Sequence, residues 1–157
     1  MTSPDARPAA GYAGDLTPRQ AWDLLAADER AVLVDVRTEG EWSTVGVPDV
    51  APLDRRTTFA EWVTPAGPNP AFLDEVRAAG LVAGDERPVV FLCRSGQRSI
   101  AAARAATAAG LGPAYNVLDG FEGDVGPDGR RGHAGWRAEG LASTTWAPSA
   151  GTDGAGA

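Results

Sequence analysis

A single cysteine, Cys93, stands between a short apolar run and a segment rich in arginine, serine and glycine. A loop that joins a buried strand to the start of a helix offers free backbone N–H groups and the positive end of the helix dipole, and both favour an anion. A thiol held in such a loop, with arginines beside it, is expected to be partly thiolate at neutral pH. The segment that follows the cysteine consists of Arg94, Ser95, Gly96, Gln97, Arg98 and Ser99. This pattern predicts a nucleophilic cysteine that carries an anionic group.

The residues of this loop have distinct predicted roles. Gly96 permits the positive φ and the close approach that a tight cradle of N–H groups requires. Arg98 is expected to act with Cys93 in catalysis by orienting an anionic substrate through its forked donors, and Arg94 to bind the same substrate near the mouth of the pocket. The other predicted substrate-binding residues, which add hydroxyl or backbone donors, are Ser95, Gln97 and Ser99.

Less specific interpretations of the same residues stay open. A lone cysteine at the end of a strand is often a small buried apolar residue. Arg98 could belong to the exposed face of a helix, although its position favours a side chain that faces the cradle. His133, the single histidine, lies in a glycine-rich segment far along the chain. A Cys93–His133 dyad for acyl transfer is conceivable, because the two side chains need only be adjacent in space.

Helix and strand signals alternate around the cysteine loop. Thr17 followed by Pro18 is typical of a helix start, and the apolar residues that predict its core face are Ala21, Trp22, Leu24 and Leu25. Further helices are expected over 70–80 and 99–109, and buried strands over 31–36, 88–92 and 115–118. The stretch 40–70 is expected to hold a short strand near 45–50 and a loop in which Trp62 is the candidate pocket wall. This alternation predicts an α/β fold: one small domain whose central, mainly parallel β-sheet is flanked by helices on both faces.

Polar residues follow three of these strands. In open α/β sheets, ligands bind beyond the carboxyl ends of the strands, and Asp35, Cys93 and Asp119 fall at such ends. Asp35 ends an apolar run, where a buried carboxylate needs partners. It is expected either to brace the cysteine loop together with Arg37 or to be a purely structural acid. Arg37 and Glu41 are expected to form an ion pair that shapes the same loop.

These segments together resemble the rhodanese-like sulfurtransferase family. The matching pieces, in order, are residues 33–37 with Glu41, the loop 93–99, residues 116–121, and Gly135 with Trp136. The resemblance covers most of residues 15–146. It implies a small α/β domain with a central parallel sheet. It also implies that Cys93 takes a sulfane sulfur from a donor, holds it as a persulfide and passes it to a thiophilic acceptor.

Two details refine the resemblance. Many family members carry a Gly-His-Ile-Pro-Gly-Ala stretch after the first strand, whereas this chain has Val-Gly-Val-Pro-Asp at 45–49, so no role of that histidine transfers here.

Related cysteine phosphatases and arsenate reductases place five residues between cysteine and arginine, which makes room for a tetrahedral oxyanion. Here four residues separate Cys93 from Arg98, and the tighter loop suits a single sulfur atom on the cysteine.

Composition limits the partners. The 157 residues include 14 Lys and Arg against 21 Asp and Glu, and the formal net charge of −7 argues against binding nucleic acid or an anionic membrane. One cysteine excludes an intrachain disulfide and one histidine excludes a multi-histidine metal site. The sulfur-transfer cycle that the resemblance implies needs neither a metal nor an organic cofactor, so none is expected. No run of about 18 apolar residues is present. The first 15 residues lack the pattern of a signal peptide, and a cytoplasmic location is therefore expected.

The ends of the chain differ from its middle. Residues 1–14 and 147–157 are rich in small residues and proline and show no hydrophobic period, so both are expected to be mobile tails around a domain at 15–146. The resulting prediction is a sulfurtransferase with a small anionic donor such as thiosulfate. Its acceptor is expected to be cyanide, a thiol or a cysteine of a partner protein. The alternatives are a non-catalytic or redox-sensing binding module and, with less support, a cysteine phosphatase or arsenate reductase.

Overall fold

The computed structural model describes residues 5–147, and its centre is a five-stranded sheet in the order β1-β8-β7-β2-β4. Every neighbouring pair in this sheet is parallel. The strands are β1 (Gly14–Leu16), β2 (Val32–Asp35), β4 (Thr57–Phe59), β7 (Val89–Leu92) and β8 (Ala114–Val117). The predicted parallel α/β sheet is therefore confirmed, and its three central strands are the three apolar runs that the sequence indicated.

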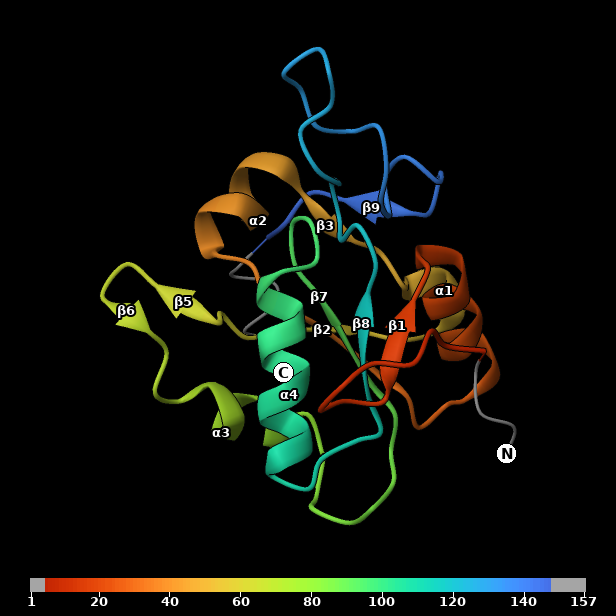
Figure 1. Cartoon of the computed structure of the whole chain (residues 1–157), viewed down its shortest axis with the longest axis vertical. Helices are drawn as coiled ribbons and strands as arrows, with labels where there is room; N and C mark the ends of the chain where they lie inside the picture. The colour runs from red at the N-terminus through yellow and green to blue at the C-terminus, as the bar shows by residue number, and fades with distance from the viewer. Residues whose placement is uncertain (1–4, 148–157) are drawn as a thin grey trace.

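Helices cover both faces of the sheet, as expected (Figure 1). On one face, α3 (Phe72–Arg77) and α4 (Arg98–Ala108) pack against the odd-numbered residues of β7, and α1 (Pro18–Ala27) packs on the other face. The remaining helices are α2 (Glu39–Val45) and the short 3-10 helix η1 (Ala51–Leu53). In Figure 1, α2 and the loop between β7 and α4 lie together at the upper end of the strands. Cys93 directly follows β7 and is the first residue of this loop.

Two small antiparallel pairs lie outside the main sheet. The pair β3 (Val47–Pro48) and β9 (Ser143–Thr144) joins the C-terminal segment to the region after α2. The hairpin β5 (Val63–Thr64) and β6 (Gly67–Pro68) precedes α3. The stretch 40–70, for which the sequence predicted one short strand, thus contains most of α2, the 3-10 helix and four short strands.

Alternation along the strands sends successive side chains to opposite faces of the sheet. In β7, Val89 and Phe91 face the α3–α4 side, whereas Val90 and Leu92 face α1. The same period carries Cys93 to the α4 side. The chemistry of the cysteine is therefore confined to one face of the sheet, beneath the start of α4.

The helix ends follow local sequence signals. Thr17 caps α1, because its hydroxyl accepts the N–H of Gln20 and the Gln20 side chain accepts the N–H of Thr17. An equivalent exchange between Thr38 and Glu41 starts α2, a helix that the sequence analysis did not predict. Its seven residues are too few to show a clear apolar period, but the Thr-x-x-Glu capping box was a usable signal.

The N-terminal boundary predicted at residue 15 falls inside β1. Tyr12 is buried, and the backbone of Arg7 pairs with that of Asp15. The described part of the predicted tail, residues 5–14, therefore packs on the domain, held in part by Arg104 of α4, which donates to the carbonyl of Ala10. Residues 1–4, and all of the predicted C-terminal tail except Ala147, lie outside the described residues.

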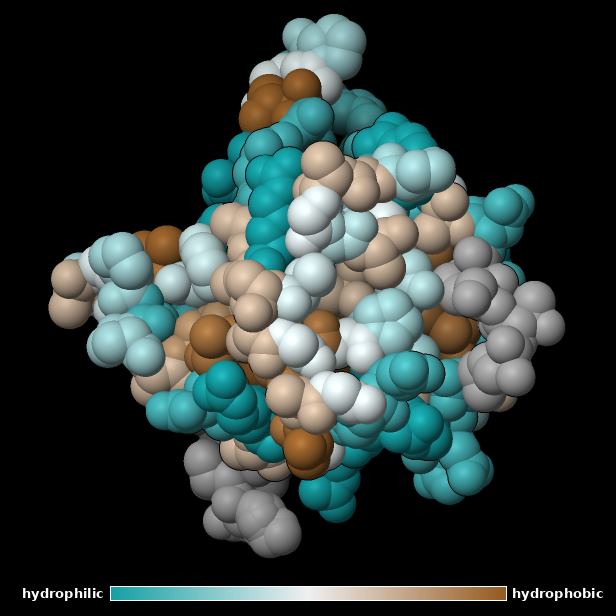
Figure 2. Space-filling model, turned by 60° about the horizontal axis from the view of Figure 1, so that its bottom comes forward, coloured by the Kyte–Doolittle hydropathy of each residue, from teal (hydrophilic) through white to brown (hydrophobic). Residues whose placement is uncertain are grey.

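The surface carries little continuous apolar area on the face seen in Figure 2, where brown areas are small and separated by polar ones. The large hydrophobic residues exposed among residues 5–147 are Val63, Val82 and Val125. Val63 lies in β5, and Val82 and Val125 lie in separate loops. Within the described ranges, no helix has the length and apolarity needed to cross a membrane.

A matched pair of substitutions tests the placement of β2 at the centre of the core. Val34 is fully buried, whereas Val82 is 63% exposed. Val34→Ala is expected to lower the free energy of unfolding by about 2 kcal/mol, because it removes two buried methyl groups and leaves a cavity. Val82→Ala should change it by less than about 0.5 kcal/mol in the same urea titration. Equal effects of the two substitutions would contradict the placement of β2.

Candidate active site at the cysteine loop

Cys93 lies directly after β7, where the chain turns toward α4. Its Sγ accepts the backbone N–H of Gly96 at 3.1 Å and lies 3.1 Å from the hydroxyl oxygen of Ser99. The thiol is free, and the residue is only 1% exposed. Gly96 adopts the predicted positive φ, 108°, which allows its N–H to point back at the sulfur. The loop thus surrounds the sulfur closely with a backbone donor on one side and a hydroxyl on the other.

The remaining loop residues differ in exposure. Arg94 and Gln97 are exposed, Ser95 and Arg98 are partly buried, and Ser99 is fully buried within the first turn of α4. No side chain caps the start of α4. Backbone N–H groups at the beginning of this helix are therefore left for other acceptors.

Arg98 is held by a carboxylate from a different element. Its Nη1 and Nη2 donate to the two carboxylate oxygens of Glu41 at 2.7 and 3.0 Å, which joins α4 to α2. The ion pair predicted between Arg37 and Glu41 is therefore wrong, since Glu41 belongs to Arg98. The sequence could not reveal this pairing because 57 positions separate the two residues.

The Glu41–Arg98 contact shifts the pKa of both side chains. Burial by itself would raise the pKa of Glu41, but the hydrogen bond from Arg98 and those from Thr38 outweigh it and lower that pKa to about 2. The hydrogen bond to Glu41 in turn raises the pKa of Arg98 above its ordinary value, against the opposing effect of burial. Both side chains thus remain charged at neutral pH, and their charges largely cancel.

Asp35 and Arg37 form a second ion pair, which is completely buried. The Nη2 of Arg37 lies 2.7 Å from Oδ2 of Asp35 and also donates to the carbonyl of Gly46. The guanidinium carbon is 4.3 Å from the centre of the Phe121 ring, so the cation stacks on an aromatic face. Phe121 is in turn bonded through its N–H to the carbonyl of Cys93. The structure thus connects the pair predicted to brace the loop to the backbone of Cys93 through one intermediate residue.

The turn after β8 holds the backbone of the cysteine loop. Phe121 donates its N–H to the carbonyl of Cys93 at 2.8 Å, and Glu122 and Gly123 donate theirs to the carbonyl of Arg94 at 2.9 and 3.1 Å. Gly120 allows this close approach, since a Cβ there would meet the oxygen of Arg94 at 2.6 Å. Asp119, predicted at the end of this strand, is exposed and belongs to the turn rather than to the cradle.

A chain of buried polar side chains runs from the sulfur to β1. Ser99 Oγ donates to Oδ1 of Asn116, and Nδ2 of Asn116 donates to Oδ1 of Asp15 at 2.9 Å. The hydroxyl of Tyr12 donates to the same carboxylate at 2.7 Å. Asn116 and Asp15 were not among the predicted site residues. The available signal was a polar residue inside an otherwise apolar strand, which requires a partner when buried.

Two other predictions concerned Trp62 and His133. Trp62 packs edge-on against Phe72 with ring centres 4.9 Å apart, on the side of the core that also holds Cys93. His133 bonds instead to Asp128 at 2.9 Å in an exposed loop, and the structure does not bring it to the cysteine as a dyad would need.

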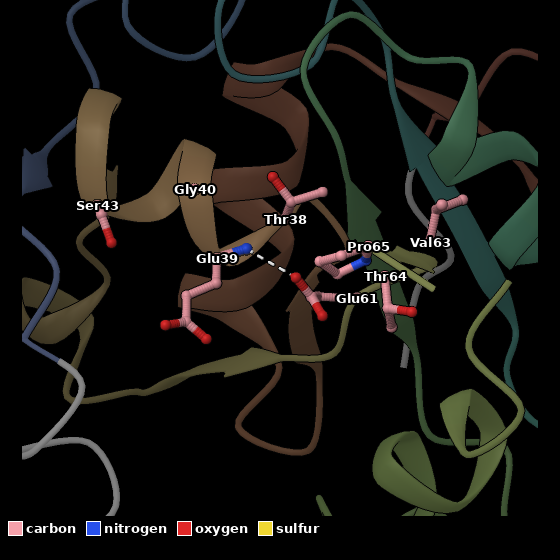
Figure 3. A pocket seen from close by; sticks show the side chains of 8 residues that line it. All are labelled: Thr38, Glu39, Gly40, Ser43, Glu61, Val63, Thr64 and Pro65. Carbon is pink, nitrogen blue, oxygen red and sulfur yellow. Dashed lines mark hydrogen bonds between the residues drawn. The ribbon is translucent and has the colours of Figure 1, made fainter. Parts of the chain in front are cut away.

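The cavity drawn in Figure 3 lies beside the N-terminal half of α2 and has a volume of about 560 Å³. Its lining residues are Thr38, Glu39, Gly40, Ser43, Glu61, Val63, Thr64 and Pro65. Neither Trp62 nor any residue of the loop 93–99 is among them. The Glu61 carboxylate accepts the backbone N–H of Glu39 at 2.8 Å (Figure 3). The two acidic side chains make this cavity a poor match for an anionic ligand. Between residues 5 and 147, no group of three or more potential metal ligands is found.

The Glu41–Arg98 pair predicts a specific dependence of stability on pH. The pKa of Glu41 is lower in the folded than in the unfolded protein. The contribution of the ionised Glu41 to the free energy of unfolding is therefore fully present above about pH 4.5 and is lost as the pH falls toward about 2. The free energy of unfolding of the unmodified protein should therefore fall by on the order of 2 kcal/mol more than that of Glu41→Gln over this range.

Urea titrations at a series of pH values provide the comparison. Glu139→Gln, the same change at an exposed carboxylate, should follow the unmodified protein. Parallel curves for Glu41→Gln and the unmodified protein would show that the ion pair contributes no pH-dependent stability.

Comparisons with known proteins agree with this architecture. A model of the rhodanese-like domain matches residues 17–125. The uncharacterized protein RC0915 of Rickettsia conorii is 38% identical over 111 residues, which span 67% of this chain and 80% of the relative. The solved structure of Rv0390 from M. tuberculosis has a TM-score of 0.78 and 55% identity, and the match covers 86% of this chain and 99% of that one.

A further solved structure is the polysulfide-sulfur transferase homodimer from Wolinella succinogenes. It has a TM-score of 0.58 and 25% identity, with 85% of this chain and 79% of that chain covered. The family model spans α1, the central strands β2, β7 and β8, and the whole cysteine loop. On the basis of this match, together with the parallel sheet and the cysteine at the end of β7, the chain belongs to the rhodanese-like domain family.

Proposed function

We propose that this protein is a sulfurtransferase that carries a sulfane sulfur on Cys93. The Cys93 thiolate attacks the outer sulfur of a donor such as thiosulfate, the sulfur–sulfur bond of the donor breaks, and sulfite leaves with the electron pair. The product is a Cys93 persulfide whose outer sulfur bears the negative charge. Cyanide, a small thiol or a cysteine of a partner protein then attacks that outer sulfur and regenerates the thiolate. The cycle balances without an external oxidant or reductant.

The observation that supports this proposal best is the short loop that closes on the sulfur. Gly96 donates its N–H directly to Sγ at 3.1 Å, and only four residues separate Cys93 from Arg98. The start of α4, which no side chain caps, follows directly on this loop. Fixed backbone dipoles of this kind stabilise charge without having to reorganise during the reaction. They suit a charge that moves by one bond length, from the inner to the outer sulfur.

One structural neighbour supports the same class of chemistry. The protein from Wolinella succinogenes is named a polysulfide-sulfur transferase, which makes polysulfide a second donor to test beside thiosulfate. A persulfide cycle depends on a free thiol, which is typical of a reducing compartment. We therefore also propose a cytoplasmic location.

The two loop arginines are proposed to have different roles. Arg98 is bound through both of its terminal nitrogens to Glu41, so we propose that it holds α4 against α2 and contributes little net charge to a donor. Arg94 is exposed on the loop next to Cys93 and is proposed to attract the anionic donor. This division revises the expectation from sequence, in which Arg98 was the main orienting group.

Turnover of thiosulfate and cyanide to thiocyanate tests the proposed chemistry. Cys93→Ser should abolish turnover, because the hydroxyl is a far weaker nucleophile and forms no persulfide, while the melting temperature stays within a few degrees. Retained turnover in that variant would contradict the mechanism. Hydrolysis of a chromogenic phosphate ester by the unmodified protein, lost in Cys93→Ser, would instead favour a cysteine phosphatase.

The roles of the arginines can be separated by kinetics. Arg94→Ala should raise KM for thiosulfate several-fold with little effect on kcat, since one cation is worth roughly 1 kcal/mol to an anionic ligand at a partly exposed site. Arg77→Ala, at an exposed arginine on α3, serves as the control and should leave KM unchanged. An unaltered KM in Arg94→Ala would exclude it as the donor-binding cation.

A further inference from the structure

The polar chain behind Cys93 is fully enclosed by the domain. Ser99 is 0% exposed, Asn116 is 1% exposed and Asp15 is 3% exposed. The three residues come from α4, β8 and β1, and the sheet register places Asn116 directly beside Asp15. All three face the α4 side of the sheet, as does the sulfur. Such a network needs a function or a structural reason, because buried polar groups are costly unless each is satisfied.

The direction of each hydrogen bond follows from the number of protons available. The Asp15 carboxylate only accepts, so Asn116 must turn its Nδ2 toward Asp15 and its Oδ1 toward Ser99. An amide oxygen has no proton, so this contact uses the single hydroxyl proton of Ser99. The Ser99 oxygen is then left as an acceptor 3.1 Å from Cys93 Sγ. A protonated thiol can donate its S–H to this oxygen, whereas a thiolate has no proton to donate and would be repelled by it.

Hydrogen bonds from several directions keep Asp15 ionised. Burial would raise its pKa, but the bonds from Asn116, Tyr12 and Arg7 outweigh burial and hold that pKa below the ordinary value. Arg7 contributes Nε and Nη2 to Oδ2 at 3.0 and 2.7 Å. The carboxylate therefore remains an acceptor across the physiological range, and the orientation of Asn116 is fixed with it.

We propose that Asn116, oriented by Asp15, is a positioning residue that accepts the hydrogen bond of the Ser99 hydroxyl and thereby favours the protonated, resting form of the Cys93 thiol. The proposal rests on Cys93 being the sulfur-carrying nucleophile. When the thiol loses its proton to solvent, Ser99 turns its O–H toward the sulfur and the Asn116 oxygen loses its donor. Once a persulfide forms, the charge moves to the outer sulfur and the hydroxyl can return to Asn116. Rotation of one hydroxyl thus accompanies each cycle.

Other charged groups lie around the sulfur and must be held constant in any test. They are Arg94 and Arg98 of the cysteine loop and α4, Glu41 of α2, the Asp35–Arg37 pair at the end of β2, and Asp119 of the turn after β8. Glu41 largely cancels Arg98, and Asp35 cancels Arg37. The proposed effect of Asp15 differs from theirs because it is transmitted through the Ser99 hydroxyl.

The substitution Asp15→Asn tests the proposal without a change of shape. Arg7 can only donate, so the introduced amide keeps its oxygen toward Arg7 and turns its NH2 group toward Asn116. Asn116 must then flip, present its oxygen to that NH2 group and its own NH2 to Ser99. The Ser99 proton is released for the sulfur. The midpoint of the pH profile for alkylation of Cys93 by iodoacetamide should fall by about one pH unit, since one hydrogen bond to a buried group changes the equilibrium by about tenfold.

A matched control and a second background make the result specific. Asp28→Asn is the same change at a carboxylate that is 4% exposed and precedes the amino end of β2, whereas Cys93 follows the carboxyl end of β7, and it should not move the midpoint. Loss of the negative charge at Asp15 also favours a thiolate directly, and this direct effect does not need the hydroxyl. The shift caused by Asp15→Asn should therefore shrink in the Ser99→Ala background to this direct part.

Two outcomes would overturn the proposal. One is a shift from Asp15→Asn that persists in full without the Ser99 hydroxyl. The other is an unchanged or higher midpoint in Asp15→Asn alone, which would mean that Asn116 does not hold the Ser99 hydroxyl proton away from the sulfur. If Asp15→Asn does not fold, Asn116→Leu removes the acceptor directly and should lower the midpoint only when Ser99 is present. Alkylation reports the thiolate whether or not sulfur is transferred, so this test and the turnover assay can fail independently.

Discussion

Three backbone hydrogen bonds, from the turn at Phe121–Gly123 to the carbonyl oxygens of Cys93 and Arg94, fix the loop on which the site depends. With these carbonyls held from outside, the following residues curl back so that the Gly96 N–H reaches the sulfur. The turn can approach so closely only because Gly120 has no Cβ and adopts a φ of +60°. The carbonyl of Gly120 also accepts the N–H of Trp136, so the fully buried Trp136 anchors the same turn to the core.

The parallel sheet divides the charges around the cysteine between its two faces. Because successive side chains of a strand point to opposite faces, Cys93, Asn116 and Asp15 lie on the α4 side of the sheet. Asp35 lies on the α1 side, as does Leu33 two residues before it. The buried Asp35–Arg37 pair thus supports the loop from the opposite face without contacting the sulfur. Such a pair is tolerated in the interior when other contacts offset the loss of water. Here Nη2 of Arg37 donates to Asp35 and to the carbonyl of Gly46, and the guanidinium stacks on the Phe121 ring, whereas the buried Nη1 has no hydrogen-bond partner. On the face that holds the sulfur, the neutral side chains of Ser99 and Asn116 separate it from the carboxylate of Asp15.

The sequence predicted those parts of the fold that have strong local signals. The apolar run of β7 ending at Cys93, the Thr17–Pro18 start of α1 and the glycines after α3 and α4 each act within a few residues. It did not predict β1, because three residues that include Gly14 and Asp15 show no apolar period. Contacts between distant positions were also beyond local patterns. The Arg98–Glu41 bond joins residues 57 positions apart, and the Asn116–Asp15 bond joins residues 101 apart. These contacts depend on strand order, which short-range spacing does not encode.

The central claim is that Cys93 accepts a single sulfur atom within this loop. Intact-protein mass spectrometry after incubation with thiosulfate tests it most directly, with samples taken before and after addition of a reducing thiol. The account predicts a gain in mass of one sulfur atom that the thiol removes and that Cys93→Ser does not show. If thiosulfate and polysulfide both leave the mass unchanged while Cys93 can still be alkylated, the thiol is accessible but carries no sulfur, and the account is contradicted.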